Sequence, residues 1–218
     1  MELENDNVIN KRKEVSFSSI IVYSLMLNAG SAFMWPLVTV YMHNYLHKSL
    51  ILAGLTILIM SVLMMVGNFV GGYLFDHWSA YKAAIISVIP SLSAIILLIF
   101  FHGWPMFGIL LMFIGLGDGS CLTLLNAYAA TIKSRSTWAV FNVVYIGQNL
   151  GIVIGTMLVG FVLKQGVSWV FFFAAFFYMI LLMVTIFNFN IEIPHVNPKN
   201  KDLSLSNEPV KKKNSTPV

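Results

Sequence analysis

Six long apolar segments separated by short polar segments dominate this chain. Each is about 20 residues long or longer, the length of helix that crosses the hydrocarbon core of a bilayer. They cover residues 17–42, 49–75, 83–101, 105–130, 137–163 and 169–189. Segments this long and continuous differ from the short alternating strands of a membrane β-barrel. We therefore predict an all-α polytopic membrane protein with six transmembrane helices.

The composition supports the same class. Hydrophobic residues make up 58% of the 218 residues and charged residues only 10%, and the mean hydropathy is +0.80. A soluble core of this size cannot bury so much apolar surface, so the expected partner is the lipid bilayer. The net charge of +4 is best explained by membrane topology, because no interleaved basic and aromatic residues indicate nucleic-acid binding.

The positive charges predict the orientation, because cytoplasmic loops hold an excess of Lys and Arg. A cytoplasmic N-terminus leaves only Lys48 and Lys164 outside. The inner side then receives Lys11, Arg12, Lys13, Lys82, Lys133, Arg135, Lys199, Lys201, Lys211, Lys212 and Lys213. Both termini are therefore predicted to be cytoplasmic. No organelle-targeting signal or signal-peptide cleavage site is seen, so a bacterial plasma membrane is expected and the first helix should remain.

The chain divides into three parts by composition. Residues 1–16 form a predicted cytoplasmic N-terminal segment, and residues 17–190 form the six-helix membrane domain. Residues 191–218 become rich in Pro, Asn, Ser, Lys and Glu, which predicts a disordered cytoplasmic tail. This tail is either a solvated terminus or a linker.

Asp118 is the only Asp, Glu, Lys or Arg inside a predicted span. A carboxylate at bilayer depth costs roughly 2.5–3.5 kcal/mol, so an intramembrane acid is a functional-site hypothesis. The alternative is a buried carboxyl hydrogen-bonded to a neighbouring Asn or Tyr. The single cysteine, Cys121, lies in the same span and excludes an internal disulfide. No cofactor or metal site is expected.

Two polar stripes predict a shared cavity, because helical periodicity places the members of each on one face. Candidates for the cavity lining are Asn28, Ser31 and Trp35 on the first span, and Asn142, Tyr145 and Asn149 on the fifth. Pro36 is expected to kink the first span beside its stripe. The alternative is that these side chains only join helices through hydrogen bonds of about 0.6 kcal/mol each.

The fifth span also carries glycines at four-residue spacing. Gly147, Gly151 and Gly155 share a face opposite the polar stripe. Small residues at this spacing let two membrane helices approach closely. We therefore predict that this face packs against a neighbouring helix.

A motif at the end of the second span and in the predicted loop up to Lys82 resembles the cytoplasmic signature of the major facilitator superfamily, G-x-L-x-D-R-x-G-R-[KR]. Gly72, Leu74 and Asp76 match it. Four positions, 77 and 79–81, depart from it, and Lys82 stands one position late. The resemblance implies that Asp76 acts as a gating latch near the Lys133 and Arg135 loop. A simpler interpretation is an ordinary turn with a helix cap.

A second motif, in the fifth span, resembles the G-x-x-x-G-P-x-x-G-G sequence of the proton-coupled multidrug efflux branch. Gly151, Gly155 and Gly160 match, while Thr156 replaces the proline. The preceding Tyr145, Asn149 and Gly151 resemble the Y-x-x-x-N-x-G run of drug-efflux members. The resemblance adds Gly160 to the helix-packing glycines.

The resemblance implies the N-terminal six-helix half of a major facilitator fold, built as a 3+3 inverted repeat. It implies a secondary transporter that uses a proton gradient to export a small-molecule substrate, with antiport by alternating access. The fourth span lacks the family's basic residue, which leaves Asp118 as the proton-coupling candidate. A missing second half, a second copy of the chain, or an inactive truncated product are all compatible with one half.

Two other classes of protein make different demands on the sequence. An intramembrane enzyme needs a nucleophile with a base, paired acids or metal ligands at membrane depth. Ser120 has no histidine within the spans, and Asp118 has no second acid. An enzyme is therefore not expected, whereas a transport-inactive scaffold remains an open alternative.

Overall fold

The computed structural model describes residues 14–191, so the predicted N-terminal segment up to residue 13 and the tail from residue 192 lie outside the described residues. The described part is helical throughout. Its elements are α1 (Phe17–Ala32), α2 (Met34–Asn44), α3 (Leu50–His77), α4 (Ala80–Phe100), α5 (Met106–Thr131), α6 (Thr137–Val162), the short 3₁₀ helix η1 (Leu163–Gln165) and α7 (Val167–Asn188).

These elements form six helices long and apolar enough to cross a membrane. The first span combines α1 and α2, and the fifth combines α6 with η1. The all-α prediction and the number of spans are confirmed within the described residues. The ends of the spans lie within three residues of the predicted ends.

The first span is interrupted at Phe33, which separates α1 from α2. The cause is Pro36, whose ring nitrogen cannot donate to the preceding turn and whose ring crowds the carbonyl four residues earlier. The backbone N–H of Phe33 bonds instead to the Gly30 carbonyl at 3.3 Å. The kink predicted beside the polar stripe is therefore present, and it falls between Ser31 and Trp35.

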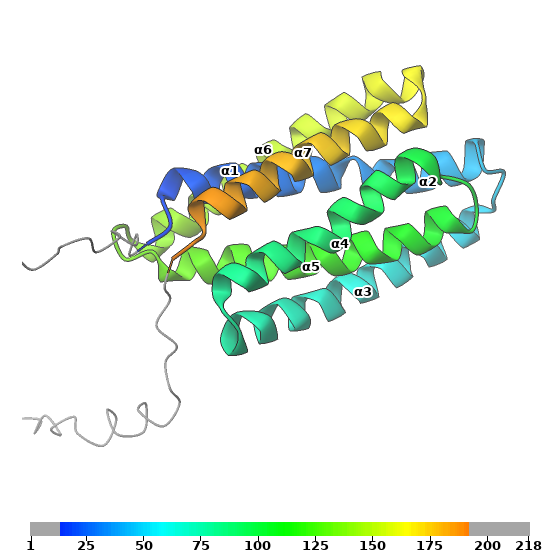
Figure 1. Cartoon of the computed structure of the whole chain (residues 1–218). Coiled ribbons are helices and arrows are strands. Elements are labelled where there is room, and N and C mark those ends of the chain that lie inside the picture. Colours follow the sequence, from blue (N-terminus) through cyan, green and yellow to red (C-terminus); the bar gives the residue numbers. More distant parts are fainter. Residues whose placement is uncertain (1–13, 192–218) are drawn as a thin grey trace, which may run out of the picture.

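The helices pack as a bundle in which both ends of the described chain lie at the same end (Figure 1). The turns between α3 and α4 and between α5 and α6 lie at this terminal end as well. The main pairs are α3 with α5 and α1 with α6, then α4 with α5 and α1 with α7, while α4 with α7 joins the two halves. When the first three spans are matched to the last three, each of the first four pairs maps onto another, as an inverted repeat requires.

Close backbone contact holds the two largest pairs together. A Cβ on Gly151 or Gly155 would lie 2.5 Å from the carbonyl oxygen of Leu25 or Ala29 on α1. One at Gly147 would meet the Ser24 hydroxyl at 3.0 Å. The predicted glycine face therefore packs against α1, where small residues permit this approach.

Hydrogen bonds between helices reinforce both contacts. The Ser24 hydroxyl donates to the Val144 carbonyl across α1 and α6, at 2.8 Å. The Ser120 hydroxyl donates to the Gly67 carbonyl across α5 and α3, at 2.9 Å. The two halves of the repeat thus use the same kind of polar link.

Gly160 does not belong to the packing face, and this part of the prediction was wrong. A Cβ at Gly160 would meet nothing within 4 Å. Five residues after Gly155 the helix has turned well away from that face, and Val159 is buried in its place.

The spans α3 and α6 with η1 are the least buried of the six. Large apolar side chains such as Phe69 on α3 and Phe161 on α6 are exposed. These surfaces face lipid or another membrane-embedded partner, because water does not stabilise so much apolar area.

Candidate functional site

Asp118 lies in the middle of α5, and three hydroxyl groups from three other helices surround its carboxyl group. Ser31 on α1 donates to Oδ2 at 2.5 Å. Ser91 on α4 donates to Oδ1 at 2.8 Å, and the Tyr178 hydroxyl on α7 also donates to Oδ1. We call these four residues the Asp118 cluster. It joins α1, α4, α5 and α7 at one point in the bundle.

The cluster has fewer hydroxyl protons than contacts. Ser31, Ser91 and Tyr178 carry one hydroxyl proton each. They share five oxygen–oxygen contacts, which include Ser31 with Tyr178 at 2.9 Å and Ser91 with the Ile114 carbonyl at 3.1 Å. When Asp118 is ionised and both Ser31 and Tyr178 donate to it, no proton is left for the contact between them.

A proton added to Asp118 supplies the contact between Ser31 and Tyr178. The acid can then donate to Ser31, while Ser31 rotates to donate to Tyr178 and Tyr178 still donates to Oδ1. Hydroxyl protons rotate freely to suit their partners. The Asp118 cluster therefore accommodates both protonation states without movement of a heavy atom.

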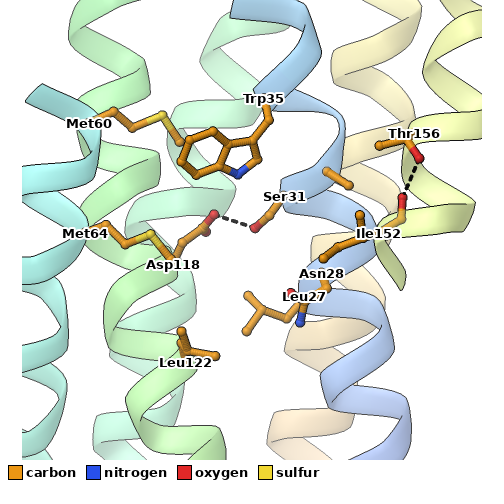
Figure 2. A pocket seen from close by; sticks show the side chains of 11 residues that line it. Leu27, Asn28, Ser31, Trp35, Met60, Met64, Asp118, Leu122, Ile152 and Thr156 are labelled. Carbon is orange, nitrogen blue, oxygen red and sulfur yellow. Dashed lines mark hydrogen bonds between the residues drawn. The ribbon is translucent and has the colours of Figure 1, made fainter. Parts of the chain in front are cut away.

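Asp118 and Ser31 open onto a cavity of about 270 Å³ between α1, α2, α3, α5 and α6. In Figure 2, Trp35 lies above the pair formed by Asp118 and Ser31. The lining consists of Leu27, Asn28, Ser31, Ala32, Trp35, Met60, Met64, Asp118, Leu122, Ile152 and Thr156. The cavity is thus mostly apolar, with one acid and a few uncharged polar groups.

A second hollow of about 400 Å³ shares Asn28 and Leu122 with the first. Its other lining residues are Asn126, Phe141, Val144, Tyr145 and Gln148. Because the two hollows meet at Asn28 and Leu122, they extend the cavity along the face between α1, α5 and α6.

Only some of the residues predicted to line a cavity do so in the structure. Asn28, Ser31 and Trp35 line the first hollow and Tyr145 the second. Asn142 and Asn149 line neither of them. The Asn149 side chain is exposed and donates to the Tyr145 carbonyl of its own helix at 2.8 Å.

Sequence patterns did not identify several members of the site. Ser91 and Tyr178 are partners of Asp118, but neither belongs to a polar stripe that was predicted. The pair Ser87 and Ser91, at four-residue spacing on α4, was the available signal for a polar face. Met60 and Met64 lie at the same spacing on α3 and carried no polar signal at all.

The residues of the cytoplasmic-type motif lie at the ends of helices. Gly72, Leu74 and Asp76 belong to the last turns of α3, with Asp76 exposed. Lys82 was expected in a loop, and this was wrong, because α4 begins at Ala80 and includes Lys82 in its first turn. Ser79 precedes α4 without a side-chain cap.

At the same end of the bundle, the segment before α1 contacts the turn between α5 and α6. The Glu14 carboxylate accepts a hydrogen bond from the Ser134 backbone N–H at 3.3 Å. The Arg135 guanidinium lies over the Phe17 ring at 5.3 Å. The α5–α6 turn is thus tied to the start of α1.

Metal ligation finds no support in the part of the chain that the structure describes, where no group of three His, Cys, Asp or Glu side chains is suitably placed. The chemistry available at the site is therefore that of one carboxyl group, its hydroxyl partners and an apolar cavity.

Six spans arranged as an inverted repeat around a cavity with a single acid are typical of half of a secondary transporter. A family model described as the Major Facilitator Superfamily matches residues 20–215. The chain belongs to this superfamily, whose members are transporters rather than enzymes. The resemblance drawn from the motifs is thereby confirmed at the level of the family.

Among curated proteins, the chain is similar to "Uncharacterized MFS-type transporter YttB" of Bacillus subtilis (strain 168). The two are 35% identical over 171 residues, which cover 78% of this chain and 43% of the relative. The chain thus spans less than half the length of the curated relative it matches.

Among solved structures, the fold is similar to that of peptide transporters. The POT family transporter PepTSo superposes with a TM-score of 0.75 at 16% identity, over 90% of this chain and 43% of that one. A peptide transporter POT in complex with sulfate gives a TM-score of 0.73 at 20% identity, over 87% and 42%. At these identities the likeness concerns the fold alone.

Proposed function

We propose that this chain forms one half of a proton-coupled transporter that exports small amphipathic molecules by alternating access. Asp118 is its proton site, and the cavity beside it binds the substrate. In this proposal the protein lies in a bacterial plasma membrane with both ends of the chain in the cytoplasm, as the distribution of Lys and Arg predicts.

The observation that carries the proposal is the position of the Asp118 cluster at the wall of the cavity. An acid that gains or loses a proton next to a substrate couples the two binding events, provided both bind to the same conformation. Because no Lys or Arg lines the cavity or hydrogen-bonds to Asp118, no neighbouring cation offsets a change of charge at Asp118. The rotating hydroxyls supply the means of accepting either state.

The lining of the cavity favours lipophilic neutral or cationic substrates. Met60, Met64 and Leu122 supply adaptable apolar surface, and the Trp35 ring offers a face to which a cation is attracted. A free carboxylate, such as that of a peptide, would find no cationic partner among the residues that line the cavity. Multidrug efflux by antiport therefore suits this half better than peptide uptake.

Alternating access requires a second half, because substrate in this superfamily lies between two six-helix halves. The exposed apolar faces of α3 and α6 are the surfaces available to it. We propose that a second six-helix half, or a second copy of this chain, packs there. Asp76, exposed at the end of α3, would then latch the cytoplasmic side when it is closed.

The test is transport into everted membrane vesicles with ethidium as the probe. The chain is expressed alone and together with the second half of the Bacillus subtilis relative. Proton-driven accumulation that an uncoupler abolishes is expected in at least one of the two cases. Asp118→Asn should eliminate this accumulation at an unchanged level of protein in the membrane.

The matched control is Ser93→Ala, which alters an exposed serine of α4 that bonds only to its own helix. It should accumulate ethidium like the unaltered chain. Full accumulation by Asp118→Asn would remove the acid from the mechanism. If the chain inserts into the membrane but ethidium does not accumulate, either with the chain alone or with the second half present, the transport-inactive scaffold is favoured.

A further inference from the structure

Two fully enclosed hydroxyl groups near the Asp118 cluster form no hydrogen bond with an oxygen or nitrogen atom of the described residues. They belong to Ser87 on α4 and Tyr23 on α1, whose side chains are 2% and 0% exposed. Buried hydroxyls are almost always hydrogen-bonded, and ordered water satisfies those that lack a protein partner. Neither residue lines the substrate cavity.

Ser87 lies beside α5 at the level of Asp118. A Cβ on Gly117, the residue before Asp118, would lie 3.2 Å from the Ser87 carbonyl and also against the Ser91 hydroxyl. Ser87 and Ser91 are four residues apart, so they share one face of α4. A line of two hydroxyls therefore leads from the carboxyl group of Asp118 along α4 toward its first residue, Ala80.

Tyr23 reaches the same region from α1. Its hydroxyl has the Cys121 thiol as a neighbour, and a thiol is only a weak hydrogen-bond partner. Cys121 follows Gly117 by four residues and so faces α4 near Ser87. A water bound to the Ser87 hydroxyl would have the two to four polar partners that a buried water needs if the Tyr23 hydroxyl and the Cys121 thiol are the others.

The two oxygens of Asp118 are connected to different surroundings. Oδ2 accepts from Ser31, which lines the substrate cavity. Oδ1 accepts from Ser91 and Tyr178, which do not line it. The carboxyl group therefore has one side toward the cavity and one side toward the interior of the bundle.

We propose that Ser87 and Tyr23 hold ordered water, and that this water and Ser91 form a proton route to Asp118 separate from the substrate cavity. This inference rests on the proposed function, in which Asp118 is the proton site. The route runs toward the end of the bundle where α4 begins, which also holds both ends of the described chain (Figure 1). In the proposed orientation this end is cytoplasmic.

The transfer is balanced in protons. The neutral acid gives its proton to the Ser91 oxygen, while the Ser91 hydroxyl passes its own proton to the water beside Ser87. Asp118 is left as a carboxylate, Ser91 is again neutral, and the proton leaves along the water as hydronium. The reverse sequence reloads the acid, and nothing is oxidised or reduced.

The titratable groups around the route are few. The helices packed against α5 bring Tyr23 and Tyr178, and α5 itself contributes Cys121 and Tyr128. Tyr81 and Lys82 lie in the first turn of α4, toward which the route runs, and Asp76 is exposed at the end of α3. Ser87→Ala and Tyr23→Phe change none of these three side chains. Changes in exchange at Asp118 can therefore be assigned to the hydroxyl groups that are altered.

The experiment follows the carboxyl group of Asp118 by infrared spectroscopy of the whole purified chain in lipid. The band of the protonated acid is assigned by its loss in Asp118→Asn, and its exchange rate is measured after a rapid change from H₂O to D₂O. Ser87→Ala and Tyr23→Phe should each slow this exchange by about tenfold, the effect of losing roughly one hydrogen bond from the barrier.

Matched controls separate the route from general effects on structure. Ser93→Ala on α4 and Tyr73→Phe on α3 remove exposed hydroxyls and should leave the exchange rate unchanged. Ser87→Thr, which keeps a hydroxyl, should restore the rate. Ser87 and Tyr23 are tested in separate variants. If one variant fails to fold, the other still tests the proton route.

Two results would overturn the inference in different ways. If Ser87→Ala and Tyr23→Phe exchange normally while Thr156→Trp, at the cavity wall, slows exchange, protons reach Asp118 through the substrate cavity. The proposed function survives that result. If no carboxyl band disappears in Asp118→Asn across the accessible pH range, Asp118 is not the proton site, and both proposals fail together.

Discussion

At the scale of single residues, the acid in the middle of the membrane domain, Asp118, lies where three hydroxyl groups can stabilise its charge. A buried carboxylate with fixed hydroxyl donors is held in one position, because each lost donor leaves a costly unpaired charge. Ser31, Ser91 and Tyr178 come from three helices. The state of Asp118 is thereby linked to the packing of most of the bundle.

Tyr178→Phe tests this link, since the ring is fully buried and keeps its packing when the hydroxyl is removed. The loss of one donor to an ionised acid costs about 1.5–3 kcal/mol. We expect a lower thermal stability in detergent and roughly tenfold slower proton-driven accumulation of ethidium. Tyr73→Phe, on an exposed tyrosine, is the control, and equal behaviour of the two variants would contradict the role of Tyr178.

Trp35→Ala tests the binding surface of the cavity. Trp35 is 42% exposed and lies above Asp118 and Ser31 (Figure 2). An interaction between a cation and this ring is worth about 0.5–2 kcal/mol, so the KM for ethidium should rise roughly 2- to 30-fold. Trp138→Ala, on a tryptophan that is 77% exposed at the start of α6, should leave the KM unchanged. An unaltered KM in Trp35→Ala would place the substrate elsewhere.

At the scale of helices, glycine spacing decides which pairs approach most closely. The contact of α6 with α1 depends on three glycines that leave room for backbone carbonyls. Close contact without side chains maximises dispersion and allows the bond from Ser24 to Val144. This contact therefore decides where the polar stripe of the first span, with Asn28 and Ser31, lies relative to α6.

Gly151→Ala and Gly160→Ala form a matched pair on α6. The added methyl group at Gly151 would lie 2.5 Å from a backbone carbonyl oxygen, whereas at Gly160 it meets open space. Overpacking should cost Gly151→Ala about 1–3 kcal/mol of stability. Gly160→Ala should be neutral or gain up to about 1 kcal/mol through helix propensity. Thermal unfolding in detergent measures both, and a larger loss at Gly160 would contradict the assigned face.

The break between α1 and α2 has a consequence for the cavity. Ser31 precedes Phe33 and Trp35 follows it, yet both line the same hollow. A regular helix would separate residues four apart by one full turn along its axis on one face. The interruption caused by Pro36 lets α2 leave the axis of α1, with Trp35 at its beginning.

At the scale of the whole molecule, the orientation in the membrane is the first quantity to measure. The chain has a single cysteine, Cys121, which is fully buried. Ser134→Cys, in the α5–α6 turn, should react with a membrane-impermeant maleimide only in everted vesicles. Gly103→Cys, between α4 and α5, should react in intact cells. The unaltered chain is the control, and the reverse pattern of labelling would place the termini outside.

The pattern of apolar segments determined the class, the number of spans and their ends, because the bilayer imposes a length and an apolar character that local sequence displays directly. It also determined that Asp118 stood alone, that Pro36 would break a helix and that three glycines would share a face. Each of these properties depends only on residues near one another in the chain.

Only the tertiary structure decided which helices meet and which hydroxyls reach Asp118. Ser91 and Tyr178 lie 27 and 60 residues from Asp118 in the sequence, and no local pattern marks them as its partners. Gly160 matched a motif yet faces open space, and Asn142 and Asn149 belonged to a polar stripe yet line neither of the two hollows. The physical reason is that the use of a helix face depends on the neighbour packed against it, and that neighbour is chosen by the whole bundle.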